Sequence, residues 1–416
     1  MNNIVVLTVP NWIQPEKNDM SKYQLLKTSN FEYVDDYDAD RKGKHFIWLK
    51  HIGDPLCYPN NTIYDGTVLD MIPTEWITSI NSGKIAVIID TAEESWGPVY
   101  PDTITHVDSA NIHLILEQNA LRVGINPNRI IWLTGDLNAQ SYCNQSDCSV
   151  YVKSICQFLF SFVNLIEKED YETVTHTPDK FLICPNRFPK AHRGYAVAKL
   201  LEYENESAPM RISFPKDLPS YPHNTIIDCY YKLQNRKNNF PEFFDPDNLI
   251  DWELLKERMY TIHETLPRVI DDIDFNIDTC AEENAISSIH DYYHRSAFCL
   301  VTETWAEGHK LFLSDAILAP ILNKTPFMVV GNCGTLDFLK SKGFKTFDSI
   351  IDESYDSIID DVTRWNTVLS EVQKLSQQDW QSKRQQVEEI VQHNFYHMFT
   401  LAPYEEQELV NWLHSC

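Results

Sequence analysis

The chain has 416 residues, 43% of them hydrophobic, and its 35 lysines and arginines stand against 60 acidic residues, giving a formal net charge of -25. A chain of this length exceeds one core of ordinary size, so we expect two domains. This excess of acidic residues disfavours a protein that binds nucleic acids or anionic membranes, because nucleic acids and such membranes are themselves negatively charged.

The sequence shows no pattern typical of a secretory leader or a membrane span. The N-terminus, "MNNIVVLTVPNW", has no basic segment ahead of its apolar residues. The most apolar later run, at 154–166, is shorter than the roughly 18 residues that cross a bilayer. The 10 cysteines form no CxxC pair, so we read them as reduced thiols and expect a cytoplasmic protein without a membrane partner.

The first part of the chain alternates strand-like and helix-like patterns. Apolar runs of strand length occupy 3–9, 45–51, 84–90 and 129–135, and helical patterns occupy 73–81 and 107–124. Strands that are apolar on both faces are typical of a sheet covered by helices on both sides. We therefore predict a Rossmann-like α/β domain over 1–168.

A polar, charged segment at 168–180 indicates a connection between domains. After it we expect strands at 180–186, 297–303 and 325–330, and helices at 192–204, 248–266, 315–323 and 369–394. These predict a second Rossmann-like domain over 169–395, followed over 396–416 by a helix that packs back on the first domain. The predicted fold class is α/β, with two Rossmann-like domains facing a central cleft.

Polar residues follow the predicted strands of the second domain, at the edge where parallel sheets bind ligands. The segment 186–193 offers cations suited to a diphosphate, although a solvated basic loop is an equal alternative. Thr302 and Glu303 end the next strand, and a carboxylate there could accept hydrogen bonds from sugar hydroxyls or be an ordinary strand-end acid. Ser314 is expected to cap a helix that begins at Asp315 and offers a second anion site.

The first domain offers carboxylates that could act as a general base on an acceptor hydroxyl. Asp90, Glu93 and Glu94 follow the strand at 84–90, and we take Glu94 as the first choice. A solvated loop is the competing interpretation. Asp136 and Asn138, after the strand at 129–135, are second-choice residues of the acceptor side.

Two further clusters have simpler interpretations than a metal site. His290 and His294 are one helical turn apart, as zinc ligands can be, but no third ligand follows at a recognisable spacing, which favours a surface helix face. The acidic run at 271–278 misses the calcium-loop pattern and is interpreted as a solvated loop. We expect no metal site.

Four motifs in order suggest a family. "IIDTAEESW" (88–96), "WLTGDLN" (132–138), "CPNRFPKAHR" (184–193) and the stretch from "SAFCLVTET" (296–304) to "LFLSDAILAPILNKTPFMVVGNCGTLDFL" (311–339) resemble a family of phage and bacterial glycosyltransferase-like proteins. That family has the two-domain B-type glycosyltransferase fold. The last stretch is also similar, more distantly, to the nucleotide-sugar motif of fucosyltransferases. The likeness runs from about residue 84 to about residue 364.

The resemblance implies roles for the residues of the second domain. Donor phosphates would be faced by Asn186, Arg187, His192 and Arg193. Glu303, Ser314 and Asp315 would hold the nucleotide or sugar, with Thr302 beside them.

The chain departs from the family at Asp315-Ala316, where Glu-Lys is usual. Replacing the lysine deletes a cation worth roughly 1.5 to 3 kcal/mol to a phosphate. Lys310, with His309 and Lys324 as further candidates, is our hypothesis for its substitute.

The implied activity is a metal-independent hexosyl- or pentosyltransferase, acting in the host cytoplasm if a phage encodes it. A UDP-sugar is the first expected donor and a GDP-sugar the second, with no tightly bound cofactor. The acceptor is a saccharide, a protein, a small molecule or a hydroxymethylated DNA base, and the charge of -25 disfavours DNA. The alternative is a catalytically silent fold that acts as a binding or assembly module, which the missing cation favours. Stereochemistry and oligomeric state stay open.

Overall fold

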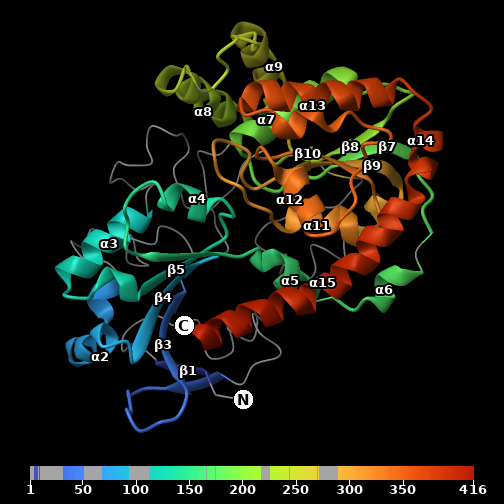
Figure 1. The fold of residues 1–416 in the computed structure, drawn as a ribbon. Helices are drawn as coiled ribbons and strands as arrows, with labels where there is room; N and C mark the ends of the chain where they lie inside the picture. The colour runs from blue at the N-terminus through green and yellow to red at the C-terminus, as the bar shows by residue number, and fades with distance from the viewer. Residues whose placement is uncertain are drawn as a thin grey trace. The chain divides into compact units, whose positions relative to one another are not determined.

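The structure is a computed structural model of the chain (Figure 1). It describes residues 4–7, 9, 31–50, 68–92, 112–164, 166–173, 175–216, 225–242, 244–268, 270 and 289–416. The candidates Glu93 and Glu94, the start of the helix predicted from 107 and the acidic run at 271–278 lie outside the described residues. Within the described residues no helix has the length and apolar character needed to cross a membrane.

The chain forms two compact units. Unit 1 comprises Met1–Leu165, His309–Phe312 and Leu401–Cys416, and unit 2 comprises Ile166–Gly308 and Leu313–Thr400. Two short pieces from late in the chain thus belong to unit 1. The domain bounds and the cleft that we infer from the sequence stay predictions.

Unit 1 is built on a six-stranded sheet in the order β2-β1-β3-β4-β5-β6, and all of its strands are parallel. The strands are β1 (Ile4–Leu7), β2 (Phe31–Val34), β3 (Lys44–Lys50), β4 (Ile85–Thr91), β5 (Ile130–Thr134) and β6 (Tyr151–Ser154). The four strands that we predict here are confirmed. The edge strands β2 and β6 were not predicted.

Helices pack on this sheet through a shared apolar core. They are α2 (Ile77–Asn81), α3 (Ile112–Arg122) and α4 (Ala139–Cys143). A further helix, α5 (Gln157–Asn164), follows β6. Val87 and Ile89, alternate residues of β4, belong to one buried cluster with Ile80 of α2 and Leu116 of α3. Alternation along a strand sends every second side chain to the same face, which explains why this face of β4 supports these helices.

The last piece of the chain also belongs to unit 1. It is the end of α15 (Glu388–Ser415), whose Trp412 ring stacks on Tyr151 of β6 at a centroid distance of 6.0 Å. The Lys153 amine lies 5.4 Å from the centre of the same indole ring. These contacts place the end of α15 beside the outer strand of the sheet.

Unit 2 has a four-stranded parallel sheet in the order β10-β9-β7-β8. The strands are β7 (Lys180–Cys184), β8 (Met210–Ile212), β9 (Ser296–Thr302) and β10 (Phe327–Val330). From β7 the chain goes to β8 on one side, while β9 and β10 follow on the other. The strand order therefore reverses between β7 and β9, which is where open α/β sheets bind ligands at their carboxyl ends. Both units are Rossmann-like α/β folds, as the sequence predicts.

The helices of unit 2 surround this sheet (Figure 1). In the described residues they are α6 (Glu169–Glu172), α7 (Ala191–Tyr203), α8 (Ile226–Asn239), α9 (Trp252–Thr265), α11 (Asp315–Leu322), α12 (Thr335–Ser341), α13 (Asp361–Ser376), α14 (Trp380–Gln386) and the part of α15 up to Thr400. Gly194 allows α7 to approach α8 closely, because a Cβ at this position would lie 2.8 Å from Cβ of Cys229.

The single helix predicted at 369–394 is wrong. Three helices, α13, α14 and α15, occupy this part of the chain. Asp360 accepts a hydrogen bond from the amide of Thr363 and starts α13 before the predicted range, and Asp379 accepts one from the amide of Ser382 and starts α14 within it. Each side chain satisfies an amide that a helix N-terminus leaves free, and so starts a new helix.

A third histidine joins the two that were assigned to a surface helix face. The rings of His290 and His294 lie 3.9 Å apart, and the ring of His176 lies 4.9 Å from that of His294. His294 is 6% exposed, so the surface interpretation is wrong for this residue. Burial lowers the pKa of His176 to about 4 and that of His294 to about 3, and nearby charges, among them Lys324, add to the effect.

These histidines should make folding sensitive to acid. Below pH 6.5 the rings of the unfolded chain bind protons, whereas the folded rings stay neutral to much lower pH, so stability falls as the pH falls. We expect His294→Phe, measured by urea unfolding, to reduce the loss of stability between pH 7 and pH 5 by roughly 1 to 2 kcal/mol.

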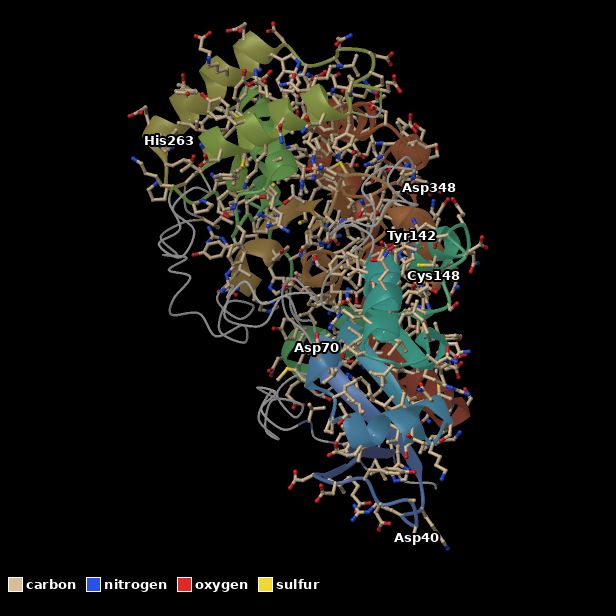
Figure 2. The ribbon with its side chains drawn as sticks, turned by 90° about the vertical axis from the view of Figure 1, so that its left-hand side faces the viewer. Asp40, Asp70, Tyr142, Cys148, His263 and Asp348 are labelled. Atoms are coloured by element: carbon tan, nitrogen blue, oxygen red, sulfur yellow. The ribbon has the colours of Figure 1, made fainter. Side chains whose placement is uncertain are left out.

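The matched control for this prediction is His263→Phe on α9 (Figure 2). This variant should keep the full loss of stability between the two pH values. Equal losses in both variants would contradict an acid-sensitive histidine cluster.

Candidate functional site

The carboxyl edge of the unit 2 sheet is the candidate site. It is formed by the residues that follow β7, β8, β9 and β10, together with the start of α7 and of α11. All of the donor-side residues predicted from the sequence lie here except Lys310. They divide into a buried set that bonds to itself and an exposed set.

Asn186 and Thr302 link the two strands on either side of the reversal point. The Thr302 hydroxyl donates to Asn186 Oδ1 at 2.7 Å, and Asn186 Nδ2 donates to the Cys184 carbonyl at 3.2 Å. The Asn186 amide donates to the Ser213 hydroxyl, 2.9 Å away, at the end of β8. Both residues are buried, and their side chains serve contacts within the protein.

The first turn of α7 holds the end of β9. His192 Nε2 donates to the Glu303 carbonyl at 2.8 Å, and burial lowers the pKa of His192 far enough to keep the ring neutral. Arg193 donates from Nε and Nη2 to the Thr302 carbonyl, at 3.2 and 3.0 Å, and from Nη1 to the Phe188 carbonyl at 3.3 Å. The two basic side chains therefore satisfy buried backbone carbonyls that would otherwise lack partners.

Glu303 joins β9 to the start of α11. Its carboxylate accepts from the Ser314 hydroxyl at 2.6 Å, from the Ser314 amide at 3.2 Å and from the Thr304 amide at 3.0 Å. Ser314 in turn caps α11 by accepting from the Ala316 amide at 3.2 Å. Glu303 has no exposed surface, and burial raises its pKa to about 7 against the hydrogen bonds of Ser314 and Thr304, which lower it.

Arg187, Phe188 and Asp315 form the accessible part of this edge. Phe188 is 37% exposed, and the Arg187 guanidinium lies 5.7 Å from the centre of its ring. Asp315 is exposed at the first position of α11. The positive charges of Arg193 and Arg187 act on the Asp315 carboxylate.

A second buried arginine fixes the loops beside β9 and β10. Arg364 donates to the carbonyls of Gly331, Ile358 and Ala306 and forms an ion pair with Asp361 at 2.5 Å. Burial raises the pKa of Asp361 to about 6, although the charge of Arg364 opposes the rise. The loop after β9 is thereby tied to the loop after β10.

Asn332, which follows β10, has at the same edge a buried side-chain oxygen that lacks a hydrogen-bond partner among the described residues. It is 1% exposed, its Nδ2 donates to the Glu307 carbonyl at 3.2 Å, and its Oδ1 has no hydrogen-bond partner within the described structure. Neither Asn332 nor Arg364 was predicted. Asn332 follows a predicted strand between two glycines and could have been found by that rule, whereas the backbone partners of Arg364 leave no trace in the sequence.

Lys310 and the acceptor-side candidates lie in unit 1. Asp136 accepts from the amides of Leu311 and Asn138, at 3.1 and 3.0 Å, and from the Tyr142 hydroxyl at 2.8 Å (Figure 2 labels Tyr142). Burial raises the pKa of Asp136, and these bonds together with the charge of Lys310 oppose the rise. Asp136 thus holds the 309–312 segment.

Two other acceptor-side candidates also have partners within unit 1. Asn138 Nδ2 donates to the His309 carbonyl at 2.9 Å. Asp90 is buried and accepts from the Trp48 indole at 2.9 Å and from the Ala92 amide at 3.0 Å.

Lys324 cannot replace the missing cation at position 316. It follows the far end of α11, and its amine donates to the Glu172 carbonyl at 2.7 Å and lies 4.4 Å from the centre of the Phe395 ring. These contacts hold the charge at the opposite end of the helix from Ala316. The hypothesis is wrong for this residue.

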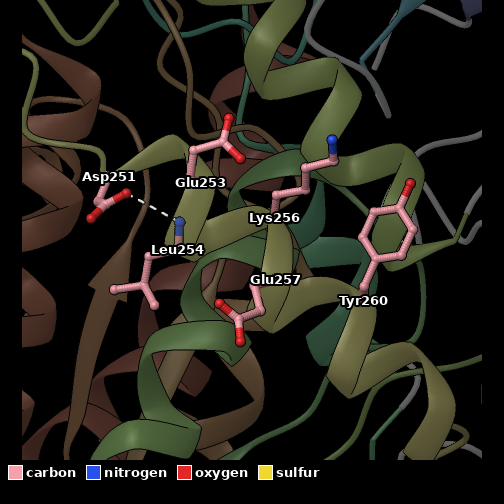
Figure 3. A pocket seen from close by; sticks show the side chains of 6 residues that line it. All are labelled: Asp251, Glu253, Leu254, Lys256, Glu257 and Tyr260. Carbon is pink, nitrogen blue, oxygen red and sulfur yellow. Dashed lines mark hydrogen bonds between the residues drawn. The ribbon is translucent and has the colours of Figure 1, made fainter.

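A surface hollow on α9 holds none of the predicted site residues. It has a volume of about 650 Å³ and is lined by Asp251, Glu253, Leu254, Lys256, Glu257 and Tyr260 (Figure 3). The Asp251 carboxylate caps α9 by accepting from the Leu254 amide. The residues that line this hollow come from one helix and its cap, and none follows a strand. We therefore place the site at the carboxyl edge of the sheet instead.

In the part of the chain that the structure describes, no group of three or more His, Cys, Asp or Glu side chains is arranged to hold a metal ion. No protein-family model matches this chain, and no curated protein sequence matches it.

The division into buried and accessible cations predicts that one substitution, arginine to lysine, has a large effect on stability at Arg193 and a small one at Arg187. Arg193→Lys keeps the charge but loses the planar fork that reaches two carbonyls, so we expect unfolding in urea to become easier by about 1 to 3 kcal/mol. Arg187→Lys, the matched control, should change stability by no more than about 0.5 kcal/mol. Similar losses in the two variants would contradict the division.

Proposed function

We propose that this protein is a glycosyltransferase that moves a sugar from a nucleotide-sugar donor to an acceptor hydroxyl, with the donor diphosphate bound at the N-terminus of α7. The observation that carries the proposal is the position of this helix end. α7 begins at the carboxyl edge, next to the point where the strand order reverses, and Lys190 before it makes no side-chain cap. The first amides of a helix lack intrahelical partners and favour an anion.

Arg187 supports the same placement. It lies three residues before Lys190, its side chain is partly exposed, and the nearby exposed Phe188 ring gives a flat surface beside it. An arginine can donate two parallel hydrogen bonds to a phosphate. The start of α11 is less suited to an anion, because Ser314 caps it and Asp315 places a negative charge in its first turn. We therefore assign the diphosphate to α7 and the sugar to the region of Asp315.

The remaining terms of the proposal rest on the resemblance of the motifs. A UDP-sugar is the first donor to test and a GDP-sugar the second. The acceptor is a saccharide, a protein, a small molecule or a hydroxymethylated DNA base. From their position after the strand at 84–90, Glu94 is proposed as the general base and Asp90 as a second catalytic carboxylate, with Glu93, Asp136 and Asn138 on the acceptor side.

A second candidate function is a silent fold that binds without transferring. The residue at 316 is alanine, where the family usually has a lysine, and Lys324 is held at the other end of α11. A site that lacks this cation would still bind a nucleotide through α7 and Arg187. Donor hydrolysis and transfer distinguish the two candidates.

A panel of UDP, GDP, CMP, dTDP and ADP sugars tests the proposal by thermal shift. A donor at a hundred times its dissociation constant should stabilise the protein by about 2.7 kcal/mol, which raises the melting temperature by a few degrees. No shift with any donor would reject the glycosyltransferase. A shift without hydrolysis or transfer to any acceptor class would favour the silent module.

Arg187→Ala should weaken binding of the responding nucleotide roughly 10- to 100-fold, because a charged hydrogen bond to a phosphate is lost. The control is Arg258→Ala on α9, where the arginine pairs with Glu202. Isothermal titration should show unchanged affinity in the control. Equal affinities in the two variants would remove Arg187 from the site.

A further inference from the structure

We propose that Glu303 is a positioning residue, which sets the start of α11 and the loop after β9 for ligand binding and does not touch the ligand itself. The inference rests on the proposed function for the identity of the ligand. It changes the role that the family resemblance implies for this carboxylate, which is direct contact with the nucleotide or sugar.

The Glu303 side chain is fully buried. Glu303 has 0% of its surface exposed, so a ligand at the sheet edge could reach the carboxylate only if the surrounding groups moved. Its Oε2 is also in use, because it accepts from the Ser314 hydroxyl, the Ser314 amide and the Thr304 amide at 2.6 to 3.2 Å. The Ser314 amide also reaches Oε1, at 3.3 Å.

Glu303 connects several elements of unit 2. The Glu303 amide donates to the Val330 carbonyl of β10 at 3.0 Å, and its carbonyl accepts from His192 of α7. Its side chain holds Ser314, the cap of α11. One residue therefore joins a neighbouring strand and two helix starts, including the one to which we assign the diphosphate. A shift of Glu303 would displace the exposed Asp315, which follows Ser314 directly.

Titration offers a way to observe this role. The charged groups that act on Glu303 are Asp315 of α11, which raises its pKa, and Arg193 of α7, whose own pKa the Glu303 charge raises; neutral His192 bonds only to its carbonyl. Burial raises the pKa of Glu303 to about 7, whereas a solvated glutamate has a pKa near 4.3. The arrangement in which Ser314 and Thr304 bond to buried Glu303 is therefore most stable at low pH, loses stability as the pH rises from about 4.3 to about 7, and changes little above that.

Amide hydrogen exchange of the free protein tests the proposal without any ligand. In the wild type, the opening constant for the amides at the start of α11, corrected for intrinsic exchange, should rise on the order of tenfold or more between pH 5.5 and 8. Glu303→Gln keeps the size and an acceptor oxygen but cannot ionise, so its opening constant should stay flat. The amides of α13 serve as an internal reference. An unchanged pH response in Glu303→Gln would overturn the proposal.

Two further variants test whether the pH response of hydrogen exchange comes from Glu303. Ser314→Ala removes the 2.6 Å hydrogen bond that lowers the pKa of Glu303, so the midpoint of the exchange response should move to higher pH. Asp337→Asn on α12, an exposed carboxylate of the same unit, should keep the wild-type midpoint. A midpoint that moves with Asp337→Asn and stays with Ser314→Ala would assign the response to another group.

Nucleotide binding separates positioning from contact. With UDP and GDP as probes, Glu303→Gln should remove the dependence of the dissociation constant on pH between 6 and 8, while binding itself persists. A loss of binding at every pH with unchanged exchange in the free protein would mean that Glu303 touches the ligand. If neither nucleotide binds the wild type, the proposed function fails, and the exchange experiment still decides whether Glu303 positions α11.

Discussion

The carboxyl end of β9 places backbone carbonyls where water cannot reach them, and the candidate site is arranged around this constraint. A buried carbonyl without a partner costs about 1 to 3 kcal/mol. The first turn of α7 meets this demand with His192 and Arg193, which donate to the carbonyls of Glu303 and Thr302. Basic residues at the mouth of a helix usually suggest a phosphate site, but here two of them point inward and stabilise the strand end.

The same constraint changes how the departure at Asp315-Ala316 is interpreted. The sequence suggests a lost cation and a search for a substitute nearby in the chain. In the structure the positive charges that act on Asp315 come from Arg187 and Arg193, in and just after the loop that follows β7. The first turn of α11 thus faces cations from another element, and the charge balance at this edge cannot be judged from residues 315 and 316 alone.

The sequence predicts those strands that are buried on both faces, because such strands appear in it as continuous apolar runs. β1, β3, β4, β5, β7, β9 and β10 are of this kind. It does not reveal β2, β6 or β8, because a charged residue interrupts the apolar run of each: Glu32, Lys153 and Arg211. Tyr151 of β6 is also 52% exposed. Helix ends in the last part of the chain depend on single capping residues such as Asp379, which a periodicity of 3.6 residues does not register.

Sequence reasoning located the candidate site better than it assigned roles within it. A residue that follows a strand must lie at the carboxyl edge of a parallel sheet, so Asn186, Thr302 and Glu303 could be placed there in advance. Whether such a side chain turns outward or inward depends on partners distant in the chain, as with Thr302 and Asn186. The third histidine of the cluster, His176, was missed for the same reason, since it comes from a segment more than a hundred residues before His290.

Unit 1 combines segments of the chain that the ribosome makes at different times. Its strands come from the first 165 residues, but it also contains 309–312 and the helix end at 401–416, where Leu409 and Leu413 are buried. At about 5 to 20 residues per second, synthesis of the intervening chain takes some tens of seconds. During that time unit 1 lacks its last helix and leaves apolar surface uncovered. The unit that is synthesised first can therefore finish folding only after the other has emerged from the ribosome.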